Sequence, residues 1–141
     1  PLLALCSAAP LLKGRPLRFH VDNAGSVYIY KKGYSSSCRY SSAIASAIAS
    51  VAAGLGCEVE LVKITRCSTV GAELADDLSK GALGKFWDLA RSTEEFSLPL
   101  EPSVVPGTLV RWASDPKPDF NLGHDILQEL SKAHGILGYS L

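Results

Sequence analysis

Hydrophobic residues recur along the chain with two different periods. The clearest helical stripe, at spacings of four, three and four, consists of Ile44, Ile48, Val51 and Leu55. This spacing places the four side chains on one side of an α-helix, which Gly54 and Gly56 are suited to end. Short apolar runs at residues 17–21 and 57–64 indicate β-strands instead. The helix between them has the length of a crossover connection, so we expect the two strands to be parallel neighbours.

The segments on either side extend this alternation of helices and strands. Residues 2–12 suit a buried helix that Pro10 shortens or kinks, and because no capping residue precedes it we expect further sequence before Pro1. Residues 26–32 combine strand propensity with a possible short helix closed by Gly33. Two more helices are predicted at residues 70–80 and 85–91. The pattern predicts an α/β layer fold.

Composition changes after Ser92, and five prolines interrupt the next segment: Pro99, Pro102, Pro106, Pro116 and Pro118. Residues 107–114 can still form a turn or two of helix, and residues 121–134 form an amphipathic helix with Asn121 as its cap. We therefore divide the chain into a core at 1–92 and, at 93–141, a proline-rich arm with a C-terminal helix. Such an arm is expected to lie on a neighbouring surface, either of its own domain or of a protein partner.

Composition narrows the class of protein. The chain has 141 residues, 47% hydrophobic and 20% charged, which fits one globular domain, and it has no apolar run near the roughly 20 residues that cross a bilayer. We expect no membrane span. The four cysteines show no Cys-x-x-Cys spacing, which argues against a zinc site and favours free thiols in a reducing compartment. The predicted location is intracellular, either cytoplasmic or nuclear.

Charge is balanced overall but uneven along the chain. The net charge is zero, which argues against a protein that coats nucleic acid non-specifically. Six cations nevertheless surround the single acid Asp22: Lys13, Arg15, Arg18, Lys31, Lys32 and Arg39. Among them Lys31, Lys32 and Arg39 are candidates for contact with a phosphate backbone. The alternative is a solvated face whose acids come from the second half of the fold.

Two carboxylates are candidates for chemistry. Asp22 ends the first predicted strand, where α/β sheets place their ligands, although it could equally cap the next segment as part of an Asx turn. Asp76 and Asp77 lie on a later helix, and only one of two adjacent residues can face a common site. Two-metal phosphodiester hydrolysis uses several carboxylates around paired Mg²⁺ ions.

Two segments together resemble a known family. Arg18-Phe19-His20-Val21-Asp22-Asn23 and the later Ala72-Glu73-Leu74-Ala75-Asp76-Asp77-Leu78-Ser79-Lys80 resemble the second half of the ribonuclease H domain of retroelement reverse transcriptases, particularly of the DIRS type. The resemblance implies a ribonuclease H-like fold with a truncated mixed sheet and flanking helices, and a helix at residues 26–32. It also implies that Asp22 and Asp76 are catalytic Mg²⁺ ligands acting on an RNA:DNA hybrid.

The chain departs from the family pattern at several positions. Ala72 stands where the family has Asn, Lys80 stands for Arg, residues 65–69 replace a histidine loop, and the first two of four acids are missing. One hypothesis is a degenerate or domesticated domain kept as a structural or interaction module, with residues 93–141 as its binding surface. The other is a Mg²⁺-dependent ribonuclease H completed by residues upstream of Pro1, with Lys31, Lys32 and Arg39 guiding the hybrid. The missing acids favour the first. An enzyme of another kind is less favoured, since no histidine lies in a nucleophile motif.

Overall fold

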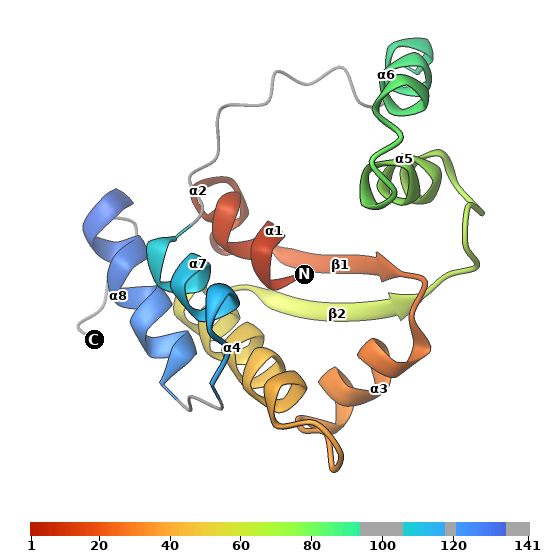
Figure 1. Ribbon diagram of the computed structural model, residues 1–141. Coiled ribbons are helices and arrows are strands. Elements are labelled where there is room, and N and C mark those ends of the chain that lie inside the picture. The colour runs from red at the N-terminus through yellow and green to blue at the C-terminus, as the bar shows by residue number, and fades with distance from the viewer. Residues whose placement is uncertain (94–105, 118–120, 135–141) are drawn as a thin grey trace.

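The structure, a computed structural model, describes residues 1–93, 106–117 and 121–134. Within these residues the chain forms eight helices and a sheet of two strands. In chain order the elements are α1 (Leu2–Ser7), α2 (Ala9–Leu12), β1 (Pro16–Val21), α3 (Ala24–Lys32), α4 (Arg39–Leu55), β2 (Glu58–Lys63), α5 (Val70–Ser79), α6 (Leu83–Ser92), α7 (Gly107–Ser114) and α8 (Leu122–His134). The class is therefore mixed α/β, as predicted (Figure 1).

The two strands are parallel neighbours, which confirms the prediction from their spacing. Leu17 is in register with Val59, and Phe19 with Leu61. Their apolar side chains face the core, whereas Arg18 pairs with Glu60 on the other face, Nε to Oε2 3.2 Å. The family resemblance implies a mixed sheet. Within the described residues the sheet consists of this parallel pair alone. Both strands end at the same edge, and that edge positions the candidate site.

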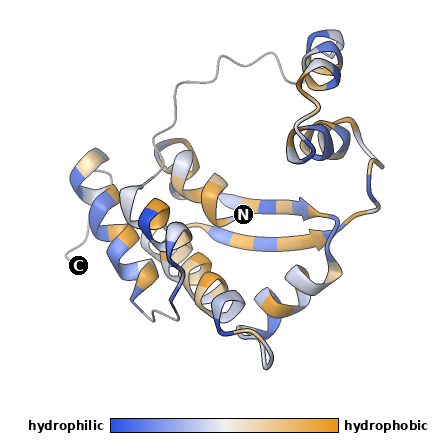
Figure 2. Cartoon of the chain, in the orientation of Figure 1, coloured by the Kyte–Doolittle hydropathy of each residue, from blue (hydrophilic) through white to orange (hydrophobic). Residues whose placement is uncertain are grey.

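Helices α1, α2, α4 and α8 contribute buried side chains to the hydrophobic core. The buried stripe of α4 meets the buried side of α8 on one face and contacts α1 on another. The α8 residues in the core are Leu122, Ile126, Leu127 and Leu130. Figure 2 shows the hydrophobic sides of α4 and α8 turned towards each other. The C-terminal helix thus buries its apolar stripe within its own chain, while the proposed division at residue 92 stays a prediction.

Local signals explain where the shorter helices begin and end. Ala8 separates α1 from α2, and Pro10 lies in the first turn of α2, so the apolar N-terminal segment is broken as predicted. Residues 24–32 are helical rather than extended. Asn23 caps α3 by accepting from the Ser26 N–H at 3.2 Å, and Gly33 ends it in the left-handed conformation with φ 91°.

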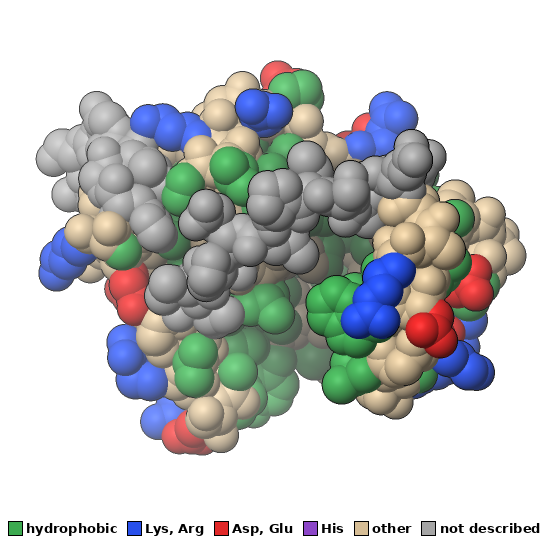
Figure 3. Space-filling view, turned by 90° about the horizontal axis from the view of Figure 1, so that it is seen from above, with side chains coloured by type: hydrophobic (Ala, Val, Ile, Leu, Met, Phe, Trp, Pro, Cys, Tyr) green, Lys and Arg blue, Asp and Glu red, His purple; other side chains and the backbone are tan. Residues whose placement is uncertain are grey.

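The pair formed by α5 and α6 lies apart from this core. The two helices pack on each other, and Figure 1 shows them on the β1 side of the sheet. Three large hydrophobic side chains of the pair are at least half exposed: Leu78, Leu83 and Trp87. Seen from above the view of Figure 1, a hollow bordered by hydrophobic side chains lies between the α5–α6 pair and the rest of the molecule (Figure 3). No helix in the described part of the chain is long and apolar enough to cross a membrane.

Candidate functional site

The first candidate acid, Asp22, follows β1 directly. The neighbouring Asn23 supplies the cap of α3, so Asp22 is not used for capping. Asp22 was expected either to face a site or to cap the next segment. The capping contact belongs to Asn23 and not to Asp22. The Asp22 carboxylate is left free to face the loop that follows β2, where its Oδ2 accepts from Arg66 Nε at 3.2 Å.

The second candidate acid, Asp76, is held by α5. Thr69 caps this helix by accepting from the Ala72 N–H at 3.1 Å, which fixes the helix start and hence the side that Asp76 presents. The Asp76 side chain is only 10% exposed and lines a pocket of about 330 Å³, whereas Asp77 does not line it. Of the two adjacent aspartates, Asp76 therefore faces the site, as predicted.

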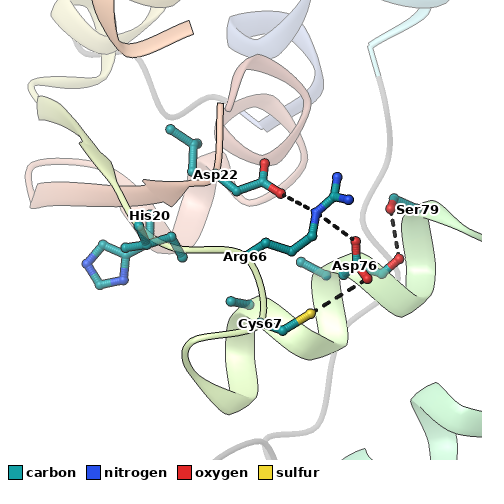
Figure 4. A pocket seen from close by; sticks show the side chains of 10 residues that line it. His20, Asp22, Arg66, Cys67, Asp76 and Ser79 are labelled. Atoms are coloured by element: carbon teal, nitrogen blue, oxygen red, sulfur yellow. Dashed lines mark hydrogen bonds and ion pairs between the residues drawn. The ribbon is translucent and has the colours of Figure 1, made fainter. Parts of the chain in front are cut away.

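Arg66 lies between the two acids. Its Nε is 3.2 Å from Asp22 Oδ2 and 3.6 Å from Asp76 Oδ1, and Lys80 Nζ contacts the other Asp76 oxygen, Oδ2, at 2.8 Å. Figure 4 shows the Asp22 and Asp76 carboxylates turned towards the Arg66 guanidinium from opposite sides, with the His20 ring pointing away. Two acids far apart in sequence thus share one cation, and the cation belongs to the protein.

The charges at the site reinforce one another. The hydrogen bond and charge of Lys80, together with Arg66, lower the pKa of Asp76. The hydrogen bond from Arg66 to Asp22 and the charges of both acids raise the pKa of the guanidinium. Cys67 has a positive φ of 56° and places its Sγ 3.7 Å from Asp76 Oδ2. Desolvation and the Asp76 charge raise the pKa of the Cys67 thiol, so it stays protonated and donates.

These residues do not fit the two-metal centre that the family resemblance implies. Such a centre needs several carboxylate oxygens around a pair of Mg²⁺ ions. Here two carboxylates converge, and a guanidinium contacts both of them. Among the described residues, no group of three or more His, Cys, Asp or Glu side chains is placed to hold a metal ion.

The three predicted phosphate-contacting cations lie elsewhere. Lys31 and Lys32 are in the last turn of α3, and Arg39 begins α4. Asp22 precedes the first turn of α3, and the helical residues 24–30, about 10 Å of helix, separate it from Lys31. The structure brings Asp22 and Asp76 together but does not bring Lys31, Lys32 or Arg39 into their pocket.

Arg66 is the residue at the site whose role the sequence analysis missed. In the sequence, residues 65–69 stand out only as a departure from a histidine-containing pattern. A signal for Arg66 was present, however, because parallel strands end at one edge of a sheet. A cation placed just after β2 is therefore close to an acid placed just after β1.

Comparisons with protein-family models, with curated proteins and with solved structures returned no match to this chain.

Proposed function

We propose that this chain is a ribonuclease H-like domain that acts as a structural or interaction module within a larger retroelement-derived protein or assembly. In this proposal it does not cleave RNA by itself. The observation that supports it is the position of Arg66, whose Nε is 3.2 Å from Asp22 and 3.6 Å from Asp76. Arg66 and Lys80 together balance the charge of the two carboxylates where the family would use Mg²⁺, and the Arg66 guanidinium between them repels a further cation.

The proposal includes a protein partner for the part of residues 93–141 that the fold leaves exposed. The apolar stripe of α8 is already buried against α4, so among the described residues of this segment α7 is the candidate for this role. Val110 of α7 is 50% exposed and Leu3 of α1 is 55% exposed, and both line an apolar groove of about 690 Å³. Exposed apolar surface of this kind is typical of interaction sites.

A second candidate function is a Mg²⁺-dependent ribonuclease H completed by residues upstream of Pro1. One observation favours it: Asp22 and Asp76 come from a strand end and a distant helix and still meet at one pocket. The resemblance gives these two residues the roles of catalytic metal ligands, and in this alternative the upstream segment supplies the remaining acids. Arg66 would then have to leave the space between the two carboxylates.

Cleavage of a labelled RNA:DNA hybrid by the chain together with its natural upstream sequence distinguishes the two candidates, because the alternative takes its remaining acids from upstream of Pro1. We expect no cleavage by the wild-type chain in Mg²⁺ or Mn²⁺, because two carboxylates held by an internal cation cannot assemble a two-metal centre. Asp77→Asn is the matched control for Asp76→Asn, since it removes the same charge from the neighbouring position. Cleavage that disappears in Asp22→Asn and Asp76→Asn but persists in Asp77→Asn would overturn the proposal and establish the nuclease.

A further inference from the structure

One corner of the molecule carries positive charge with no acid nearby in sequence. Between Asp22 and Glu58 the chain contains no Asp or Glu, yet it contains Lys31, Lys32 and Arg39. None of these three cations forms an ion pair within the described part of the structure, whereas the cations of the Asp22–Asp76 pocket, Arg66 and Lys80, are both paired. Their charge is therefore available to an anionic ligand.

A compact turn joins the two helices that carry these cations. Gly33 ends α3 in the left-handed conformation, which reverses the chain. The Ser35 N–H then donates to Ser42 Oγ at 2.7 Å, and the Ser42 hydroxyl contacts the Ser35 carbonyl oxygen at 3.1 Å. These contacts hold the end of α3 against the first turns of α4. They thereby keep the segment after Lys32 close to Arg39.

Exposed tyrosines surround the central lysine of this corner. The Nζ of Lys32 lies 5.5 Å from the ring centroid of Tyr28 and 4.5 Å from that of Tyr34. Tyr28 is 63% exposed and Tyr34 is 51% exposed, so both rings keep accessible surface although Lys32 contacts them. Interaction with Tyr28 and then Tyr34 raises the pKa of Lys32, which keeps its ammonium charged. Because both tyrosine rings are more than half exposed, neither belongs to the hydrophobic core.

We propose that this α3–α4 corner, consisting of Tyr28, Lys31, Lys32, Tyr34 and Arg39, binds single-stranded nucleic acid. The two tyrosines stack on unpaired bases, and the three cations contact the phosphates. Aromatic rings and cations together are the combination that single-strand-binding proteins use, because every base has a face on which a ring can stack. The corner is separate from the Asp22–Asp76 pocket, and the inference does not depend on the proposed function.

A duplex is a poorer ligand for this corner. In a duplex the base faces are stacked on one another, so exposed tyrosines cannot reach them and only the cations contribute. A single strand offers both its phosphates and its base faces. Preference for single strands over duplexes is therefore the property that separates this site from a general basic patch.

Fluorescence anisotropy with a labelled uridine 12-mer, a matched RNA duplex and a matched RNA:DNA hybrid tests the inference on the full chain. We expect the single strand to bind tightest. Tyr28→Leu with Tyr34→Leu should weaken its binding by about fivefold or more while leaving duplex binding unchanged. Lys31→Gln, Lys32→Gln and Arg39→Gln together should abolish binding, and in the wild type log K against log salt should have a slope of about −2.

Two control variants remove the same chemistry from other surfaces. Trp87→Leu removes an exposed aromatic side chain beside Arg91 on α6, and Lys13→Gln, Arg15→Gln and Lys85→Gln together remove three charges outside the corner. Both controls should retain wild-type affinity for the single strand. Equal affinity for single strand and duplexes, or unchanged single-strand affinity in the tyrosine variant, would overturn the inference. Circular dichroism confirms that each variant is folded before it is scored.

Discussion

Arg66 matters at this site because of where it lies rather than because of what it adds to stability. Its side chain is 66% exposed, and ion pairs of exposed side chains contribute little to the free energy of unfolding. The guanidinium nevertheless contacts both carboxylates that the family resemblance assigns to metal binding. One substitution in the loop after β2 can therefore change the chemistry of the pocket while leaving the fold intact.

Asp76 should make the stability of the protein depend on pH in the acid range. Lys80 and Arg66 lower its pKa below the ordinary value of 3.8. A carboxylate with a lowered pKa in the folded state contributes stability above that ordinary value and loses it as the pH falls through the folded-state value. We predict that Asp76→Asn lowers the free energy of unfolding at pH 7, and that the difference from wild type disappears at the acid end.

Urea denaturation at pH 7 and at successive pH values below 4 measures this difference. The matched control is Asp77→Asn, which removes a charge from the same helix but leaves the contacts of Asp76 in place. The prediction is wrong if Asp76→Asn and Asp77→Asn have the same effect at pH 7. It is also wrong if the Asp76→Asn deficit persists at low pH.

Residue types indicated the two acids but not the cation between them. Asp22 was found because a polar residue at the end of an apolar strand is conspicuous, and Asp76 because it matches a helical motif. Arg66 lies in a loop without periodicity, and its contacts depend on how the loop crosses the strand ends. The choice between Asp22 and Asn23 as the cap likewise needed coordinates, because both residue types are suited to it.

At the scale of elements, the close approach of α4 and α8 holds the C-terminal part of the chain in place. Gly123 is the contact point: a Cβ added there would lie 2.6 Å from Ser50 Cβ and 3.2 Å from Ala47 Cα. The small residues of α4 allow this approach, and the buried leucines and isoleucine of α8 fill the adjacent space. Glu129 then joins α8 to α7 by accepting from the Gly107 and Thr108 N–H groups at 2.7 and 2.9 Å.

We predict that Gly123→Ala destabilises the protein by about 1–3 kcal/mol, although alanine favours a helix more than glycine does. The added methyl group has to push α8 away from α4. Gly84→Ala in α6 is the matched control, because a Cβ there meets nothing within 4 Å. It should leave the protein unchanged or up to about 1 kcal/mol more stable. Equal unfolding midpoints for wild type and Gly123→Ala in a urea titration would contradict the close contact.

The identity of most elements and the pairing of the two strands could be predicted from sequence, but the packing partners of the helices could not. Spacing of apolar residues indicated α4 and α8, and the apolar runs indicated β1 and β2 and their parallel pairing. The stripe of α8 was expected to cover some surface, yet an amphipathic helix does not specify which one. The pairing depends on Gly123 and on the small side chains opposite it, which become meaningful only when the two helices are side by side.

At the scale of the whole molecule, the Asp22–Asp76 pocket and the α3–α4 corner lie at opposite ends of α3. The Asp22–Asp76 pocket lies at the strand ends, where its charges are paired internally. The α3–α4 corner lies at the other end of the helix, where its cations are unpaired among the described residues. Ligand binding at the corner would use none of the pocket residues, so the two surfaces can be tested independently.

We propose that the Arg66 guanidinium takes the place of a metal ion between Asp22 and Asp76. Titration with Mg²⁺, followed by NMR of the Asp22 and Asp76 carboxyl groups, tests it most directly in wild type, Arg66→Gln and the control Arg18→Gln. Arg18 makes an equivalent contact, Nε 3.2 Å from Glu60, away from the pocket. We predict Mg²⁺-dependent shifts at both carboxyl groups in Arg66→Gln only. Saturable shifts of equal size in the wild-type protein would contradict the claim.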